Sequence, residues 1–527
     1  MATLWTGGII YTMERAGETV EAVLEKDGQI VAVGSAESLL PQATEVRDLQ
    51  GNVMYPGFVD SHLHIIGYGE KLMHIDVSNV TSKEELLHII GERMEGASSE
   101  QWVVAIGMNE TGYTEPIFPT LSELDALGEA HLIIKRSCHH LILANSKALA
   151  FANITNDTPS PEGGIIEKKN GQLTGVLKDT ALYLIVNHMP YYTPDYIEEA
   201  LQKSVASLQS YGLVGGHSED LSYFGPPSQP INAYRKIVDA QQSFKVHLLQ
   251  HHTVFEEVAL LNEQSTRYVQ FGAMKIFVDG AFGGRTAALR EPYCDDPENS
   301  GILVHSSTQL EHYVQLARRY GQTVAVHAIG DLAIETILDI FTANPPQAGQ
   351  LDRLIHCSLV DEAILEKLAS LPIAVDMQPQ FVQGEYLAEL VKLGEQRSQG
   401  LHPLKSLLDR GLIVAGGSDA PIEVPNPLFG IYAAVTRRNF GESHEGFGPQ
   451  EKISRFDAVR LYTVGSAEII GQEYTRGKIK EGFSADFTVF EEDIFAVDIE
   501  KVPHIPVAYT VVDGRIVYEK TKNRCEA

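Results

Sequence analysis

Eight short apolar segments that alternate with helical patterns constrain the fold of this 527-residue chain more than any other feature. The apolar segments cover residues 53–59, 212–217, 245–250, 273–278, 323–326, 353–356, 373–377 and 413–416. Helical patterns precede or separate most of them, for example at 194–211, 307–320, 361–370 and 403–410. Strands that alternate with helices are typical of parallel βαβ units, and eight of them predict an α/β fold of the TIM-type (β/α)8 barrel class. Functional side chains of such a barrel lie at the carboxyl ends of the strands.

A large insertion is expected after the first strand, because about 150 residues separate it from the second where one βα unit needs far fewer. Residues 68–193 contain their own elements, with a helix near 82–94, strands at 102–106 and 132–135, and a turn at Gly163-Gly164. Loops at the carboxyl face of a barrel carry specificity, so we expect this segment to form a cap over the barrel mouth.

The two ends of the chain carry short strand patterns with hairpin turns. Strands are predicted at 8–12, 20–25 and 29–33, with a turn at Lys26-Asp27-Gly28, and again at 485–490 and 508–518 around Asp513-Gly514. We expect residues 1–52 and 471–527 to build one small β-sandwich. The barrel then consists of residues 53–67, which hold the first strand, and 194–470, with the cap at 68–193.

Composition excludes several classes of protein. Hydrophobic residues make up 44% and charged residues 21% of the chain, as in soluble globular domains. The net charge of −29 repels phosphate backbones and anionic lipids, so neither nucleic acid nor a membrane surface is an expected partner. Four scattered cysteines without a C-x-x-C pair indicate neither a disulfide framework nor a cysteine zinc site. Without a signal-like or membrane-spanning segment, the chain is expected to be cytoplasmic.

The first apolar segment runs directly into a His-x-His motif, in the stretch Met54-Tyr55-Pro56-Gly57-Phe58-Val59-Asp60-Ser61-His62-Leu63-His64. Side chains two residues apart on an extended backbone share one face and can bind one ion, and imidazole suits zinc and its neighbours. An isolated His-x-His is also common on solvated loops. The motif therefore carries weight only if other strand ends supply further ligands.

Four more residues of ligand type lie in equivalent positions. Lys275 lies in the fourth predicted strand, His327 follows the fifth, His356 ends the sixth, and Asp419 follows the eighth. Each alone has a structural explanation, such as a hydrogen-bonded histidine or a paired lysine. Together with His62 and His64 they form a six-residue set at one end of the barrel, which indicates an active site.

These motifs resemble those of the amidohydrolase superfamily, and more closely those of its amidohydrolase-3 branch, which includes N-substituted formamide deformylases. The resemblance covers nearly the whole chain. Its strongest motifs are Pro56-Gly57-Phe58-Val59-Asp60-Ser61-His62-Leu63-His64, Lys275-Ile276-Phe277-Val278-Asp279-Gly280, Val326-His327-Ala328-Ile329-Gly330-Asp331 and Gly417-Ser418-Asp419-Ala420-Pro421.

The resemblance implies a metal-dependent hydrolase. His62 and His64 would bind one divalent ion, His327 and His356 a second, and Lys275 would bridge both after carboxylation, since an unmodified ammonium has no lone pair. Asp419 would bind the first ion and act as general base and then acid on a metal-activated hydroxide. Zinc is the expected metal, although the same ligands accept manganese, iron or cobalt. The resemblance implies one or two divalent ions per chain. It also implies a homodimer.

Other residues are candidates for contacts with the substrate. His140 in the insertion and Arg285 just beyond Lys275 are candidates for binding the substrate, with cap packing and a structural ion pair as the alternatives. The His251-His252 pair lies near the predicted mouth, but the six-residue ligand set is complete without it.

The expected reaction is hydrolysis of an amide or another non-peptide C–N bond of a small molecule, such as an N-substituted formamide or an N-acyl amine. Two alternatives stay open. The same metals could hydrolyse a cyclic amide or an ester, and a barrel that has lost its chemistry could serve as a binding protein.

Overall fold

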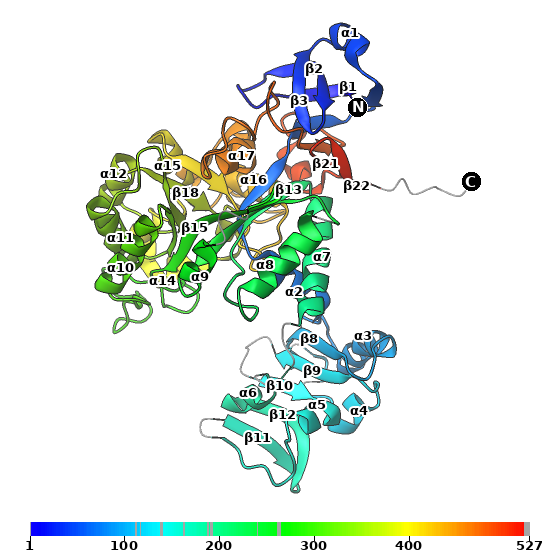
Figure 1. Ribbon diagram of the computed structural model, residues 1–527. Coiled ribbons are helices and arrows are strands. Elements are labelled where there is room, and N and C mark those ends of the chain that lie inside the picture. The colour runs from blue at the N-terminus through cyan, green and yellow to red at the C-terminus, as the bar shows by residue number, and fades with distance from the viewer. Residues whose placement is uncertain are drawn as a thin grey trace. The chain divides into compact units, whose positions relative to one another are not determined.

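The computed structural model describes residues 2–110, 113–115, 117–136, 141–161, 164–186, 189, 193–239, 241–260 and 265–520. The chain divides into two compact units, one formed by Met1–Tyr68 with Ile197–Ala527 and the other by Gly69–Tyr196. The first unit contains a barrel and a sheet built from both chain ends, and the second is the segment inserted after the first barrel strand (Figure 1).

The barrel consists of eight strands, and every hydrogen-bonded neighbour pair is parallel. In chain order they are β6 (Phe58–Leu63), β13 (Leu213–Ser218), β14 (Lys245–His251), β15 (Val269–Phe277), β16 (Val324–Ala328), β17 (Asp352–His356), β18 (Ile373–Met377) and β19 (Ile413–Gly416). This order is also their spatial order. The predicted α/β barrel is confirmed, because strands buried on both faces leave continuous apolar runs in the sequence.

Helices between the strands cover the barrel. They include α7 (Pro194–Ser210), α10 (Ser307–Arg319), α11 (Asp331–Ala343), α12 (Glu362–Ser370) and α15 (Leu404–Asp409). Helix α10 begins with a capping box, in which Ser306 and Gln309 satisfy each other's backbone N–H groups. Its buried face carries Leu310 and Val314, each stabilising the fold by roughly 1.5–3 kcal/mol through apolar burial.

The first predicted strand, residues 53–59, belongs to two different sheets. Residues Val53–Pro56 (β5) pair with strands of the terminal sheet, and the barrel strand β6 begins only at Phe58. Gly57 lies at the crossing, where a Cβ atom would be 2.5 Å from Cγ2 of Val214. The close approach of β13 and the missing N–H of Pro56 explain the break. An unbroken apolar run does not reveal such a change of sheet.

Strands from both chain ends form one eight-stranded sheet (Figure 1). It contains β1 (Ala2–Tyr11), β2 (Thr19–Lys26), β3 (Gln29–Gly34), β4 (Glu45–Asp48), β5, β20 (Phe487–Phe490), β21 (Val507–Val512) and β22 (Arg515–Glu519). Both predicted hairpin turns have positive φ at their two central residues, 54° and 82° at Asp27-Gly28 and 50° and 75° at Asp513-Gly514. The contact between Trp5 and Phe487, with ring centroids 5.9 Å apart, joins the two ends in one core.

The inserted unit contains a six-stranded mixed sheet in the order β11-β12-β10-β9-β8-β7. Its strands are β7 (Ile75–Asp76), β8 (Trp102–Met108), β9 (His131–Arg136), β10 (Leu141–Ala144), β11 (Gly164–Lys169) and β12 (Gln172–Asp179). Helices α3 (Lys83–Glu95), α4 (Leu121–Asp125) and α5 (Ser146–Phe151) accompany them, and two separate apolar clusters pack the unit. Gly163 of the predicted turn lies outside the described residues. None of the helices formed by described residues is long and apolar enough to cross a membrane.

Candidate metal centre

The six predicted ligands all lie at or near the carboxyl ends of barrel strands. His62 is in β6 and His64 follows it, Lys275 is in β15, and His327 is in β16. His356 ends β17, and Asp419 lies in the loop after β19. Both His356 and Asp419 have positive φ values, 74° and 55°, an uncommon conformation for these residue types that often marks functional sites.

One group of ligand atoms surrounds the carboxylate of Asp419. Its Oδ1 atom lies 3.5 Å from Nε2 of His62 and 3.5 Å from Nε2 of His64. Ligand atoms of these three residues lie within 4.8 Å of one another, and no other group of three His, Cys, Asp or Glu residues in the described part of the chain does so. Two imidazoles and a carboxylate are a donor set that suits zinc and similar divalent ions.

The other three residues continue from His62. The Nζ atom of Lys275 lies 3.1 Å from Nε2 of His62, and the ring centroids of His62 and His356 are 5.8 Å apart. The centroids of His356 and His327 are 4.5 Å apart. The structure therefore brings all six predicted residues into one connected cluster.

Burial determines the protonation of most of these groups. It lowers the pKa values of His62 and His327 well below the ordinary value, and that of His356 to about 4. Neutral imidazoles have the lone pair that a metal requires. Burial also lowers the pKa of His64, but the hydrogen bond and charge of Asp419 outweigh it and raise the value to about 9.

The carboxylate and the lysine differ from the histidines. Burial raises the pKa of Asp419, but its hydrogen bond to His64 and the nearby His356 hold it below its ordinary value, so the group is ionised at neutral pH. Burial lowers the pKa of Lys275 to about 8. The cluster thus combines three neutral imidazoles, those of His62, His327 and His356, with an ionised carboxylate, and this donor set fits a divalent cation.

The second ring nitrogen of three histidines contacts an acceptor. Nδ1 of His64 lies 2.5 Å from the carbonyl oxygen of Glu219, and Nδ1 of His356 lies 2.7 Å from Oε1 of Gln378. Nε2 of His327 lies 3.1 Å from the carbonyl oxygen of Gly280. These contacts orient the rings and assign the opposite nitrogen to an ion.

Asp60 connects the first and last barrel strands beneath the cluster. Its carboxylate accepts hydrogen bonds from the backbone N–H of His62 at 3.1 Å and from Oγ of Ser418 at 2.6 Å. The N–H of Asp419 donates to the carbonyl of His62 at 2.8 Å. Burial raises the pKa of Asp60 to about 7. These bonds fix the loop that carries Asp419 against the His-x-His strand.

Arg353 supports the same strand from inside the barrel. Its guanidinium is fully buried, pairs with both carboxylate oxygens of Asp376 at 2.9 and 3.0 Å, and donates to the carbonyl of Ser61 at 2.8 Å. Sequence reasoning assigned no role to Arg353, Asp60, Gln378 or Glu219. Gln378 and Glu219 directly follow strands β18 and β13, and this position was the available signal.

Of the two predicted substrate-binding residues, only Arg285 lies in the described part of the chain. The Arg285 guanidinium forms an ion pair with Asp295, at 3.1 and 2.6 Å, and its substrate contact stays a prediction. His140 lies outside the described residues. His251 contacts Oγ1 of Thr253 at 2.7 Å and stacks on His252, with ring centroids 4.4 Å apart.

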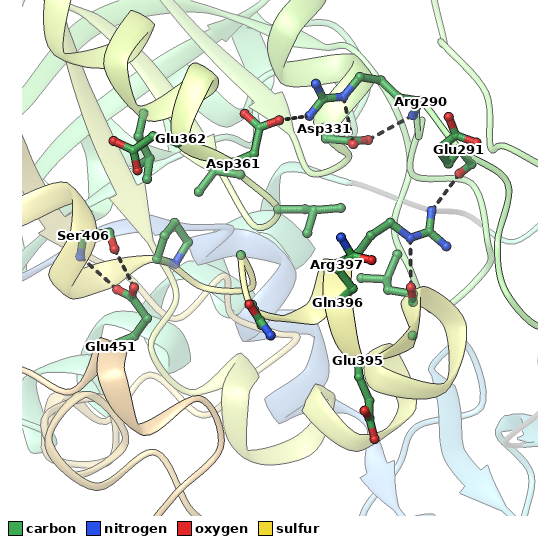
Figure 2. Close-up of a pocket in the computed structure, with 18 of the residues that line it drawn as sticks. Arg290, Glu291, Asp331, Asp361, Glu362, Glu395, Gln396, Arg397, Ser406 and Glu451 are labelled. Carbon is green, nitrogen blue, oxygen red and sulfur yellow. Dashed lines mark hydrogen bonds and ion pairs between the residues drawn. The ribbon is translucent and has the colours of Figure 1, made fainter.

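A cavity of about 960 Å³ lies elsewhere in the same unit and includes none of the six ligands in its lining. Figure 2 shows its charged wall, in which Arg290 reaches Asp331 and Asp361, while Arg397 donates to the carbonyl of Glu291. Asp331, the last residue of the His327 motif, therefore forms an ion pair with Arg290 in this wall. The chemistry of the cluster, not cavity size, therefore makes it the candidate functional site.

Comparison with known proteins places this chain among metal-dependent hydrolases. The family model described as "Amidohydrolase family" matches residues 45–518. The chain is 44% identical to the putative amidohydrolase YtcJ of Bacillus subtilis, over 99% of this chain and 100% of that protein. The N-substituted formamide deformylase of Arthrobacter pascens is 27% identical over 97% of both chains. A solved structure, an uncharacterized metal-dependent hydrolase from Pyrococcus horikoshii, matches with a TM-score of 0.80 and 26% identity, over 95% of this chain and 99% of that one.

Proposed function

Because the chain belongs to the amidohydrolase family of metal-dependent hydrolases, we propose that it hydrolyses an amide or related non-peptide C–N bond of a small molecule. The observation that carries the proposal is the convergence of His62, His64 and Asp419, with ligand atoms within 4.8 Å of one another. Lys275, His327 and His356 extend this group. We propose that the six residues hold two divalent ions, most simply zinc.

Ions bound here would lower the pKa of a coordinated water toward neutrality and polarise the scissile carbonyl. The carboxylate of Asp419 is ionised and lies beside two ligand nitrogens, so it is placed to accept the proton of the attacking water. It then returns that proton to the departing nitrogen. Water and an amide are converted into a carboxylic acid and an amine without a covalent enzyme intermediate.

Lys275 is proposed to carry a carboxyl group that bridges the two ions. Its pKa of about 8 leaves a fraction of the amine neutral near pH 7, and only the neutral amine has the lone pair that attacks carbon dioxide. The reaction of the amine with carbon dioxide forms a carbamate and releases one proton, and the carbamate offers two oxygen ligands. The Nζ atom of Lys275 lies 3.1 Å from Nε2 of His62, which supports this role.

The substrate class we propose is an N-substituted formamide or another N-acyl amine. The full-length similarity to a protein named N-substituted formamide deformylase supports it. A cyclic amide or an ester on the same centre is the second candidate, because the choice of scissile bond depends on the pocket. The cytoplasmic location and the homodimer remain predictions.

Turnover by the metal-loaded protein tests the proposal. Protein stripped of metal and reloaded with zinc would be incubated with N-substituted formamides, N-acyl amines, cyclic amides and esters, and the released acid and amine quantified. Asp419→Asn should abolish turnover, whereas His444→Ala, at an exposed ion pair with Glu442, should leave it unchanged. A fully zinc-loaded protein that is inert to the whole panel would favour a binding protein.

A further inference from the structure

A buried carboxylate lies directly behind His64. Glu219 follows strand β13, and its backbone N–H donates to the carbonyl of Leu63 at 3.1 Å in the neighbouring strand β6. Its side chain is 0% exposed, and its carboxylate interacts with the hydroxyl of Tyr223 and with His64. Burying a carboxylate in this way is costly, so its retention calls for a function.

The backbone of Glu219 fixes the tautomer of His64. Its carbonyl oxygen lies 2.5 Å from Nδ1 of His64, and a carbonyl can only accept, so Nδ1 carries the proton in the neutral ring. The lone pair is then on Nε2, which lies 3.5 Å from the Asp419 carboxylate, on the side of the ligand cluster.

The side chain of Glu219 approaches the same ring nitrogen. Its Oε2 atom lies 3.9 Å from Nδ1 of His64, which places a negative charge on the side of the ring opposite the ligand nitrogen. The neighbouring Asp220 is different, because its Oδ2 atom accepts from the hydroxyl of Tyr234 at 2.5 Å and from the N–H of Ile66 at 3.2 Å. The Asp220 carboxylate is therefore held by Tyr234 and Ile66, whereas the Glu219 carboxylate faces His64 and Tyr223.

We propose that Glu219 is a positioning residue that acts through His64, with its carbonyl fixing the ring tautomer and its carboxylate strengthening Nε2 as a metal ligand. The inference rests on the proposed function, since it assigns a metal to His64. A negative charge behind an imidazole stabilises the positive charge that the ring shares with an ion. Loss of such an outer partner typically weakens metal binding by about 10–100-fold.

The test is the zinc affinity of Glu219→Gln, measured by competition with a chromophoric chelator. Glutamine preserves the shape and the backbone carbonyl but removes the charge, so affinity should fall about 10–100-fold and Glu219→Asp should recover part of it. Glu389→Gln is the matched control, because Glu389 is also buried and contacts a histidine, with Oε2 2.8 Å from Nε2 of His402. Its zinc affinity should stay within about twofold of wild type.

The tautomer of His64 provides a second measurement that needs no variant at this position. In metal-free wild-type protein above pH 9, 15N NMR should show the proton on Nδ1 of His64. A proton on Nε2, or a Glu219→Gln affinity within twofold of wild type, would overturn the inference. If the wild type hydrolyses amides but Glu219→Gln binds zinc as tightly as wild type, only the role of Glu219 is refuted. If Glu219→Gln binds zinc more weakly but the wild type is inert to every substrate, only the proposed reaction is refuted.

Discussion

Replacing Arg353 by methionine should destabilise the barrel strongly. The Arg353 guanidinium makes two contacts with Asp376, at 2.9 and 3.0 Å, and one with the carbonyl of Ser61, and both charged side chains are buried. Methionine fills the space but leaves the Asp376 carboxylate without its partner. Removing one member of a buried ion pair costs about 3–5 kcal/mol of the free energy of unfolding.

The two tryptophans of the chain provide the assay. Trp5 lies in the terminal sheet of the barrel unit, and Trp102 lies in the inserted unit. In a Trp102→Phe background, urea unfolding followed by tryptophan fluorescence reports the barrel unit alone. Arg353→Met should lower the free energy of unfolding measured there by about 3–5 kcal/mol.

The double variant Arg353→Met/Asp376→Leu separates the charge from the packing. It removes both charges, so it should be more stable than the sum of the two single effects predicts, with a coupling of about 0.5–3 kcal/mol. A loss below about 1 kcal/mol in Arg353→Met, or additive single effects, would refute the reasoning that Asp376 is left as an unpaired buried charge.

Three further predictions concern the cluster itself. Burial lowers the pKa of Lys275 from 10.5 to about 8, so the unfolded chain binds more protons at this residue than the folded chain between these pH values. In metal-free buffer purged of carbon dioxide, the free energy of unfolding of wild type should therefore rise by about 3 kcal/mol relative to that of Lys275→Met between pH 8 and 10.5. A pH-independent difference in urea unfolding would contradict this sign. Gln378→Leu removes the hydrogen-bond acceptor of His356, so its zinc affinity in chelator competition should fall about 10–100-fold. Gln378→Glu should restore the affinity, and an unchanged affinity in Gln378→Leu would contradict the orienting role of Gln378. Gly417→Ala would place a Cβ atom 2.7 Å from the backbone nitrogen of His62, so we expect zinc content and thermal stability both to fall, and a variant that keeps full zinc content would contradict this.

The barrel and the positions of the six candidate ligands at its strand ends were predictable because their signals are local. Strands buried on both faces leave apolar runs, and the residue type at each strand end can be read directly, as for His327 and His356. The run at 53–59 shows the limit of this reasoning. Its division between two sheets depends on the contact of Gly57 with Val214, which lies far away in the sequence.

The residues that support the ligands were not predictable in the same way. Asp60 bonds to Ser418 across 358 positions, and Arg353 bonds to Ser61 across 292, so neither contact leaves a local pattern. In the inserted unit, strands at 102–106 and 132–135 were predicted, whereas the short strand β10 was missed because four residues carry little periodicity.

Metal content per chain, measured by elemental analysis of wild type and Lys275→Ala prepared side by side, tests the central claim most directly. The account predicts about two divalent ions in wild type and one or none in the variant, because Lys275 is proposed to bridge both ions. One ion in wild type that is fully retained in Lys275→Ala would contradict the two-ion centre and give Lys275 a structural role.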